Sequence, residues 1–151
     1  MAAEAAVHEC YLRSADGLRL FHRERALSAE SPHIVLVHGV AEHGGRYRHV
    51  EDFLASRGVG SSVVDLRGHG RSEGRRVWTP GFESYLEDLG LVLRHVHSRV
   101  GRVFLAGHSL GGLIAVRYAE TRSPTPPLGG LITSGAALRR PFCRPRPWSG
   151  C

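Results

Sequence analysis

The chain has 151 residues, of which 42% are hydrophobic, 23% charged and 7% aromatic, which excludes a disordered or fibrous chain and indicates one globular domain. No apolar run approaches the roughly 18 residues of a membrane span, and the N-terminus lacks a secretory-signal pattern, so a cytoplasmic protein is expected. The formal net charge of +6 comes from 20 scattered arginines and no lysine; without a binding motif, these predict no nucleic-acid partner.

The predicted elements alternate between strands and helices after an initial hairpin. In chain order they are strand 8–13, strand 18–26, strand 33–38, helix 47–56, strand 60–66, helix 82–100, strand 102–107, helix 110–121 and strand 130–134. Asp16-Gly17 predicts a two-residue turn between the first two strands. The later strands read as short apolar runs buried on both faces. The order predicts an α/β fold, a three-layer sandwich with a largely parallel sheet.

The three cysteines and the proline-rich C-terminal segment support two separate predictions. Cys10, Cys143 and Cys151 are odd in number and widely spaced, which predicts free thiols in a reducing compartment and neither a disulfide framework nor a zinc site. We therefore expect no metal and no cofactor. Residues 139–151 combine three prolines with four arginines, a density that neither a helix nor a central strand tolerates, and they are expected to form an unstructured tail after a domain at 1–138.

The segment Gly107-His-Ser-Leu-Gly111 carries the clearest chemical signal. It is a G-x-S-x-G sequence that follows a predicted buried strand and opens a predicted helix. A sharp strand-to-helix turn forces its central residue into a strained backbone state, and the flanking glycines leave room for the neighbouring strand and helix. The turn would lift the Ser109 hydroxyl above the sheet, beside the positive end of the helix. We expect Ser109 to be a catalytic nucleophile.

A second motif would complete an oxyanion hole. His38-Gly39 ends a predicted strand and opens a glycine-bearing loop. In this architecture that loop supplies one donor and the residue after the nucleophile supplies the other. By position these donors would be the backbone N–H groups of Val40 and Leu110. Two such groups stabilise a tetrahedral oxyanion by several kcal/mol.

Three segments in order resemble one known group. His38-Gly-Val-Ala-Glu-His-Gly-Gly-Arg-Tyr47, Asp65-Leu-Arg-Gly-His-Gly-Arg-Ser-Glu-Gly74 and Gly107-His-Ser-Leu-Gly-Gly112 look like the monoacylglycerol lipase group of α/β-hydrolases, also described as lysophospholipase-like or serine aminopeptidase S33-type. The resemblance runs from about Leu18 to Leu138 and implies the N-terminal half of the fold. It implies hydrolysis of a monoacylglycerol or lysophospholipid ester, with transient contact to a membrane surface. The loop residues His38, Glu42, His43, Arg46 and Tyr47 would shape the oxyanion loop.

The catalytic acid and base of the family pattern have no counterpart in these residues. In α/β-hydrolases the order is Ser, then Asp or Glu, then His. All ten histidines precede Ser109, and Glu120, inside the following helix, is the sole acidic residue after it. A serine without a base is a weak nucleophile, so the 151 residues alone are expected to be nearly inactive.

Upstream groups are expected to be structural. His38 is the best-placed substitute base, but the family uses it for loop geometry. His108 should point away from Ser109, His69 and Asp65 should make local hydrogen bonds, and His95 and His97 should lie on the surface.

Two alternative functions remain open. In one, a second polypeptide supplies Asp and His; the exposed edge of the last strand is where a partner, or a second copy of the chain, would add. In the other, the protein kept the fold as a non-catalytic binding or scaffold protein. A dehalogenase or epoxide-hydrolase activity would need an Asp nucleophile, and position 109 is Ser.

Overall fold

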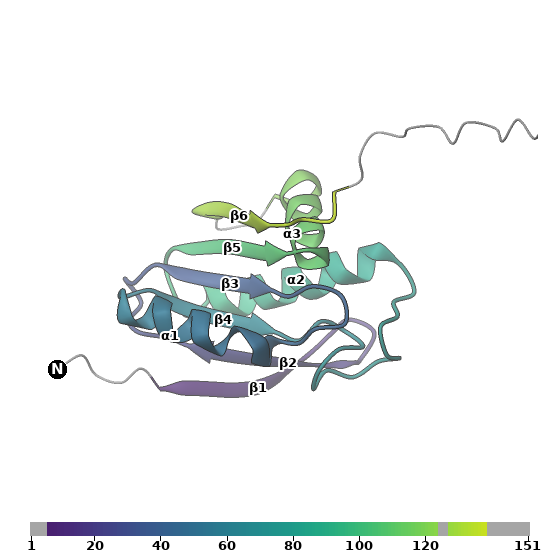
Figure 1. Ribbon diagram of the computed structural model, residues 1–151, viewed down its shortest axis with the longest axis horizontal. Helices are drawn as coiled ribbons and strands as arrows, with labels where there is room; N and C mark the ends of the chain where they lie inside the picture. Colours follow the sequence, from purple (N-terminus) through teal and green to yellow (C-terminus); the bar gives the residue numbers. More distant parts are fainter. Residues whose placement is uncertain (1–5, 124–126, 139–151) are drawn as a thin grey trace, which may run out of the picture.

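The computed structural model describes residues 6–123 and 127–138, which form one six-stranded sheet with helices on both faces (Figure 1). The predicted tail at 139–151 lies outside the described residues. The strands are β1 (Val7–Arg13), β2 (Arg19–Arg25), β3 (His33–Val37), β4 (Gly60–Val64), β5 (Val103–His108) and β6 (Gly130–Ser134). Their order across the sheet is β1-β2-β4-β3-β5-β6; β1 and β2 are antiparallel to their neighbours, and the other strands are parallel. This arrangement confirms the predicted three-layer α/β sandwich.

The helices are α1 (Arg48–Ser56), α2 (Phe82–His97) and α3 (Leu110–Thr121). A 3₁₀ turn, η1 (Gly44–Tyr47), precedes α1, where the sequence predicts the start of the helix itself. The α2 helix ends at His97, three residues before the predicted end. Prediction and structure agree for the bounds of α3 and β6.

The sheet separates two unequal apolar layers. On one face, Leu20, Val35 and Leu105 pack with the buried sides of α2 and α3. On the other face, Leu36, Val63 and Ala106 pack against Val50 and Leu54 of α1. The α2–α3 layer is the main core, and β4 is buried along its whole length between the two layers.

The β1–β2 connection differs from the predicted two-residue turn. Arg13 pairs with Arg19, and the N–H of Ser14 donates to the carbonyl of Leu18 (2.9 Å), so three residues remain in the loop. Gly17 has φ 88°, the left-handed conformation that a three-residue hairpin loop needs at its last position. The extra residue shifts the register of the hairpin by one relative to a two-residue turn.

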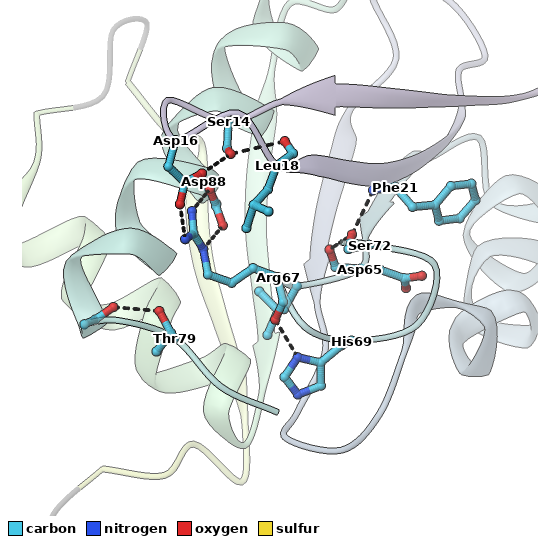
Figure 2. Close-up of polar contacts among 12 residues, drawn as sticks. Ser14, Asp16, Leu18, Phe21, Asp65, Arg67, His69, Ser72, Thr79 and Asp88 are labelled. Atoms are coloured by element: carbon cyan, nitrogen blue, oxygen red, sulfur yellow. Dashed lines mark hydrogen bonds and ion pairs between the residues drawn. The ribbon is translucent and has the colours of Figure 1, made fainter. Parts of the chain in front are cut away.

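Buried ion pairs tie distant segments together. Arg67 makes a bidentate contact with Asp88 of α2 (2.6 and 2.7 Å) and also binds Asp16 in the hairpin loop (2.7 Å), as Figure 2 shows. On the opposite face, Arg23 of β2 pairs with Glu51 of α1. Both arginines are buried, so these pairs fix the positions of α1, α2 and the hairpin relative to the sheet.

The β6 edge contrasts with this packing, because Leu131 and Ile132 are exposed there. Within residues 6–123 and 127–138, no helix has the length and apolar character that a bilayer crossing requires.

Candidate active site

Ser109 occupies the junction between β5 and α3, at the carboxyl end of a central parallel strand. Its backbone has φ 51° and ψ −114°, a conformation that costs a non-glycine residue about 1–3 kcal/mol. The surroundings hold this conformation in place. The Ser109 N–H donates to the carbonyl of Ser134 (2.9 Å), and the Ser109 carbonyl accepts from the N–H groups of Leu113 (3.1 Å) and Ala137 (3.0 Å). The sharp turn predicted from the sequence is therefore present.

Glycines make the turn sterically possible. A Cβ at Gly107 would overlap the backbone of Gly111, and a Cβ at Gly111 would overlap the carbonyl oxygen of Val37 in β3. A Cβ at Gly112 would lie 2.7 Å from the Cβ of Ala136. The helix that follows Ser109 consequently packs directly on the backbone of β3 and on the segment after β6. No larger residue fits without moving one of these elements.

The loop after β3 lies against Ser109. A Cβ at Gly39 would be 3.2 Å from the Ser109 Cβ, which measures how close the loop backbone comes. Glu42 braces the loop, because its Oε2 accepts from the Gly39 N–H (3.1 Å) and from the Tyr47 hydroxyl (3.0 Å). Ala41 has φ 57°, so the loop turns sharply just after Val40.

The pKa values of the bracing pair follow from these contacts. Burial together with the Glu42 carboxylate raises the pKa of Tyr47 to about 12, so its hydroxyl keeps the proton that it donates. Burial alone would raise the pKa of Glu42, but the hydrogen bonds from Gly39 and Tyr47 lower it overall. Glu42 is thus an ionised brace for the loop and is already engaged as a hydrogen-bond acceptor.

Two backbone donors are free beside the serine. Within the described part of the chain, neither the Val40 N–H nor the Leu110 N–H donates a hydrogen bond. Leu110 is the first residue of α3, where N–H groups lack an intrahelical acceptor and the helix dipole favours negative charge. The two residues predicted as oxyanion donors therefore have N–H groups available for a ligand.

Two histidines on the strands that lead to the site, His38 after β3 and His108 at the end of β5, bind backbone carbonyl groups. His38 is fully buried; its Nδ1 donates to the carbonyl of Gly39 (2.7 Å), and its Nε2 accepts from the N–H of Leu66 (2.9 Å). Burial lowers the pKa of His38, which keeps the ring neutral in this role. His108 Nδ1 donates to the carbonyl of Ser134 (2.9 Å). Both rings hold backbone in place, as the sequence predicts.

The loop after β4 is held by local hydrogen bonds to Asp65 and His69. Asp65 accepts from the N–H groups of Gly44 (2.5 Å) and Arg71 (2.8 Å). His69 Nδ1 donates to the carbonyl of Arg67 (2.9 Å), which lies beside the Arg67 ion pairs in Figure 2. The predicted local role of Asp65 and His69 is confirmed.

The expectation that His95 and His97 are surface residues is wrong. Both side chains are half-buried, and burial lowers the pKa of each. His95 packs edge-on against the buried ring of His22 in β2, with ring centroids 5.2 Å apart. The sequence periodicity of α2 does not show this, because the contact depends on which part of the helix faces the hairpin.

Comparison with known proteins gives a family match. The model of the family described as serine aminopeptidase, S33 matches residues 29–150. A monoacylglycerol lipase of Mycolicibacterium smegmatis is 40% identical over 108 residues, which are 70% of this chain and 38% of that protein. The human monoglyceride lipase is 35% identical over 137 residues, which are 87% of this chain and 44% of that protein. The chain thus spans less than half the length of these two relatives.

Solved structures agree in fold. The monoacylglycerol lipase of Paleococcus ferrophilus superposes with a TM-score of 0.63 at 31% identity, over 89% of this chain and 45% of that one. A thioesterase domain from the curacin biosynthetic pathway superposes with a TM-score of 0.73 at 26% identity, over 91% of this chain and 49% of that one.

Proposed function

Because the chain belongs to the serine aminopeptidase S33 family of α/β-hydrolases, we propose that it supplies the nucleophile and the oxyanion hole of a carboxylic ester hydrolase. Ser109 attacks the ester carbonyl, and the N–H groups of Val40 and Leu110 bind the oxygen that becomes negative. The alcohol leaves, an acyl group stays on Ser109 Oγ, and water releases it as a carboxylic acid.

The observation that carries the proposal is the backbone of Ser109. Its strained conformation, φ 51° and ψ −114°, is maintained by hydrogen bonds to Ser134, Leu113 and Ala137. A structural serine at a strand–helix junction gains nothing from this strain, whereas a nucleophile gains exposure beside two free N–H groups. The close approach of Gly39 to Ser109 puts the Val40 loop on the same side of the site.

In the family pattern, the acid and the base that take the Ser109 proton follow the nucleophile in the sequence. Both ring nitrogens of His38 are bound to backbone groups, Nδ1 of His108 is bound to the carbonyl of Ser134, and no His or Asp follows Ser109 in these 151 residues. We infer that the base and its acidic partner belong to a further part of the same polypeptide or to a second chain. Without them, catalysis falls by a factor on the order of 10⁶, as in a serine protease that lacks its base.

The substrate class follows from the relatives and is part of the proposal. Those named above are a monoacylglycerol lipase and a monoglyceride lipase, and a Bacillus subtilis relative at 30% identity is a phospholipase. We expect an ester with one acyl chain, a monoacylglycerol or a lysophospholipid, met at a membrane surface. The exposed β6 edge would take either the segment that carries the base or, in its absence, a second copy of this chain.

Active-site labelling tests the nucleophile separately from turnover. The purified chain is treated with excess fluorophosphonate, and the modified residue is located by mass spectrometry. We expect slow labelling confined to Ser109, lost in Ser109→Ala and kept in Ser134→Ala, whose side chain lies on the adjacent strand. Labelling of another serine would contradict the assignment of the nucleophile. Rapid labelling and rapid ester hydrolysis would instead show that the chain holds its own base.

A non-catalytic binding role is the second candidate, favoured by His38, whose two ring nitrogens are both bound to backbone groups. Under that role, Ser109→Ala would leave the protein's biological effect unchanged.

A further inference from the structure

A second cluster of chemically reactive side chains lies away from Ser109, between the β1–β2 hairpin and α2. Its members are Cys10 of β1, His22 of β2 and His95 of α2, and one potential ligand atom from each lies within 4.8 Å of the others. His22 is fully buried, while Cys10 and His95 are half-buried. The nucleophile, the oxyanion loop and the buried Arg67 network do not involve this cluster.

The register of the hairpin creates the cluster. Cys10 and His22 are directly paired across β1 and β2, so their side chains leave the sheet on the same face. Leu20, two residues before His22 and therefore on that face, packs in the core with α2. The last turns of α2 cross this face and bring the His95 ring against His22. Three elements thus place one sulfur and two imidazoles together.

The buried ring of His22 lacks a full set of partners. Its Nδ1 lies 3.7 Å from Cys10 Sγ, and its Nε2 is buried without a hydrogen-bond partner in the described part of the chain. A neutral imidazole has one donor and one acceptor nitrogen, so one of them is unsatisfied whichever tautomer forms. An ion on Nδ1 would fix the proton on Nε2, and a buried water is an ordinary partner for that N–H group.

The cluster matches a zinc site in donor type, and the distance between Cys10 and His22 matches as well. Zn²⁺ prefers thiolate and imidazole ligands in a tetrahedron, with bonds of about 2.3 Å to sulfur and 2.0 Å to nitrogen. Such bonds separate a sulfur from a nitrogen ligand by about 3.5 Å, close to the 3.7 Å between Cys10 Sγ and His22 Nδ1.

The charged groups around the cluster are Arg99 and Glu24. Arg99 donates to His95 Nε2 (3.0 Å) and pairs with the buried Glu24 of β2 (2.9 Å). The two contacts use different nitrogens of Arg99, Nη1 toward His95 and Nη2 toward Glu24, so an ion at His95 Nε2 would displace the Nη1 contact alone. Glu24, two residues from His22 on the same strand face, remains as a nearby negative charge that favours a cation.

We propose that Cys10, His22 and His95 form a zinc site with three protein ligands and one water, which fastens the hairpin to α2. On binding, the Cys10 thiol loses its proton to solvent, and the sulfur and two neutral imidazole nitrogens donate electron pairs to Zn²⁺, with no change in oxidation state. The fourth position stays with water.

Cobalt substitution tests the site in the full chain, made without an affinity tag. The background carries Cys143→Ser and Cys151→Ser, so that Cys10 is its single thiol. After chelator treatment and dialysis, Co²⁺ is titrated and the thiolate-to-cobalt charge-transfer band is recorded, and Zn²⁺ is then added to displace it. We expect one Co²⁺ per chain, stoichiometric displacement by Zn²⁺, and a Tm that rises by several degrees when free Zn²⁺ is about 100 times Kd.

Three variants locate the ion. Cys10→Ser should abolish the charge-transfer band, and His95→Gln should weaken binding by about 100-fold or more, at least the loss caused by changing an outer-shell group. His49→Gln, the same substitution at an exposed position of α1, should bind as the background does. Far-ultraviolet circular dichroism of the metal-free variants checks folding.

The proposal is overturned if the background protein shows no band, if its Tm does not respond to Zn²⁺, or if the band persists in Cys10→Ser. Should a variant fail to fold, the Tm response of the background protein to zinc and chelator still decides the question. None of these measurements depends on ester hydrolysis, so the result is independent of the function proposed for Ser109.

Discussion

The strands β4 and β6, Gly-Ser-Ser-Val-Val and Gly-Leu-Ile-Thr-Ser, are both five residues long and both begin with glycine, but they have very different surroundings. All five residues of β4 are buried between the layer of α1 and the layer of α2, whereas four of the five residues of β6 are exposed. Figure 1 shows β6 at one edge of the sheet, next to α3, with β1 at the other. The comparison teaches that a strand's sequence predicts its pairing, while its burial depends on helices contributed from elsewhere.

The two regions are the covered part of the sheet around β4 and the exposed side at β6 and α3. The largest expected difference between them is the cost in free energy of unfolding when an ion pair is lost. Arg67→Met removes the buried partner of Asp88 and Asp16 in the covered region, and leaving buried Asp88 unpaired should cost about 3–5 kcal/mol of the free energy of unfolding. Arg117→Met removes an exposed ion pair with Glu120 on α3 and should cost less than about 1 kcal/mol. Urea unfolding followed by circular dichroism measures both; equal costs would contradict the comparison.

A matched pair of leucines tests apolar packing. Leu105 of β5 and Leu131 of β6 are directly paired across the two strands, and their exposed fractions are 0% and 40%. Leu105→Ala should lower the free energy of unfolding by about 3 kcal/mol, because it leaves a cavity in the core. Leu131→Ala should cost less than about 1 kcal/mol in the same urea titration, since little apolar surface leaves the interior. A large cost at Leu131 would show that β6 is covered in solution, for example by self-association.

Acid should weaken the covered region through its buried histidines. Burial lowers the pKa of His33 in β3 to about 4, while the unfolded chain has the ordinary value near 6.5. Between these values the unfolded state binds a proton that the folded state does not, so stability falls as the pH drops from about 6.5 to 4. From pH 7 to 4.5 the loss attributable to His33 should be about 2 kcal/mol.

Urea unfolding at several pH values, with chelator present, measures this slope. His33→Gln should have a shallower slope by about that amount, although its stability at pH 7 also falls because the hydrogen bond to Ser62 changes. An unchanged slope would mean that the pKa of His33 is the same in the folded and the unfolded chain.

The smallest change in the free energy of unfolding is expected at Ser109, which lies between the covered strand β5 and α3. Ser109→Gly should raise the free energy of unfolding by about 1 kcal/mol relative to Ser109→Ala, because glycine adopts φ 51° without the penalty that alanine shares with serine. Thermal unfolding of the two variants and the parent measures it. A parent as stable as Ser109→Gly would show that the turn stores no strain.

Short-range patterns were sufficient to predict much of this molecule. The apolar runs of β3 and β5 and the periodicity of α2 gave the strand and helix order, and G-x-S-x-G located Ser109 with its glycines. These features depend on neighbours within a few residues. The β2 strand, Arg-Leu-Phe-His-Arg-Glu-Arg, is different, because its charged residues are buried by partners such as Glu51, 28 residues away.

The Cys10–His22–His95 cluster shows why other features could not be predicted from the sequence. A two-residue turn at Asp16-Gly17 would pair Cys10 with residue 23, whose side chain faces α1. The observed three-residue loop pairs it with His22, on the α2 face. One residue of loop length therefore decides whether these side chains meet, and His95 joins them through the docking of α2, which no local pattern predicts.

The hydrogen bonds that hold the elbow also set an order of events during synthesis. Both backbone groups of Ser109 have acceptors or donors in Ser134 and Ala137, more than twenty residues further along the chain. On the ribosome, Ser109 and the start of its helix leave the exit tunnel while those partners are still inside it. The backbone of Ser109 therefore gains its hydrogen bonds to Ser134 and Ala137 only after β6 has docked on β5. Until then, the strained conformation of the nucleophile is not held in the nascent chain.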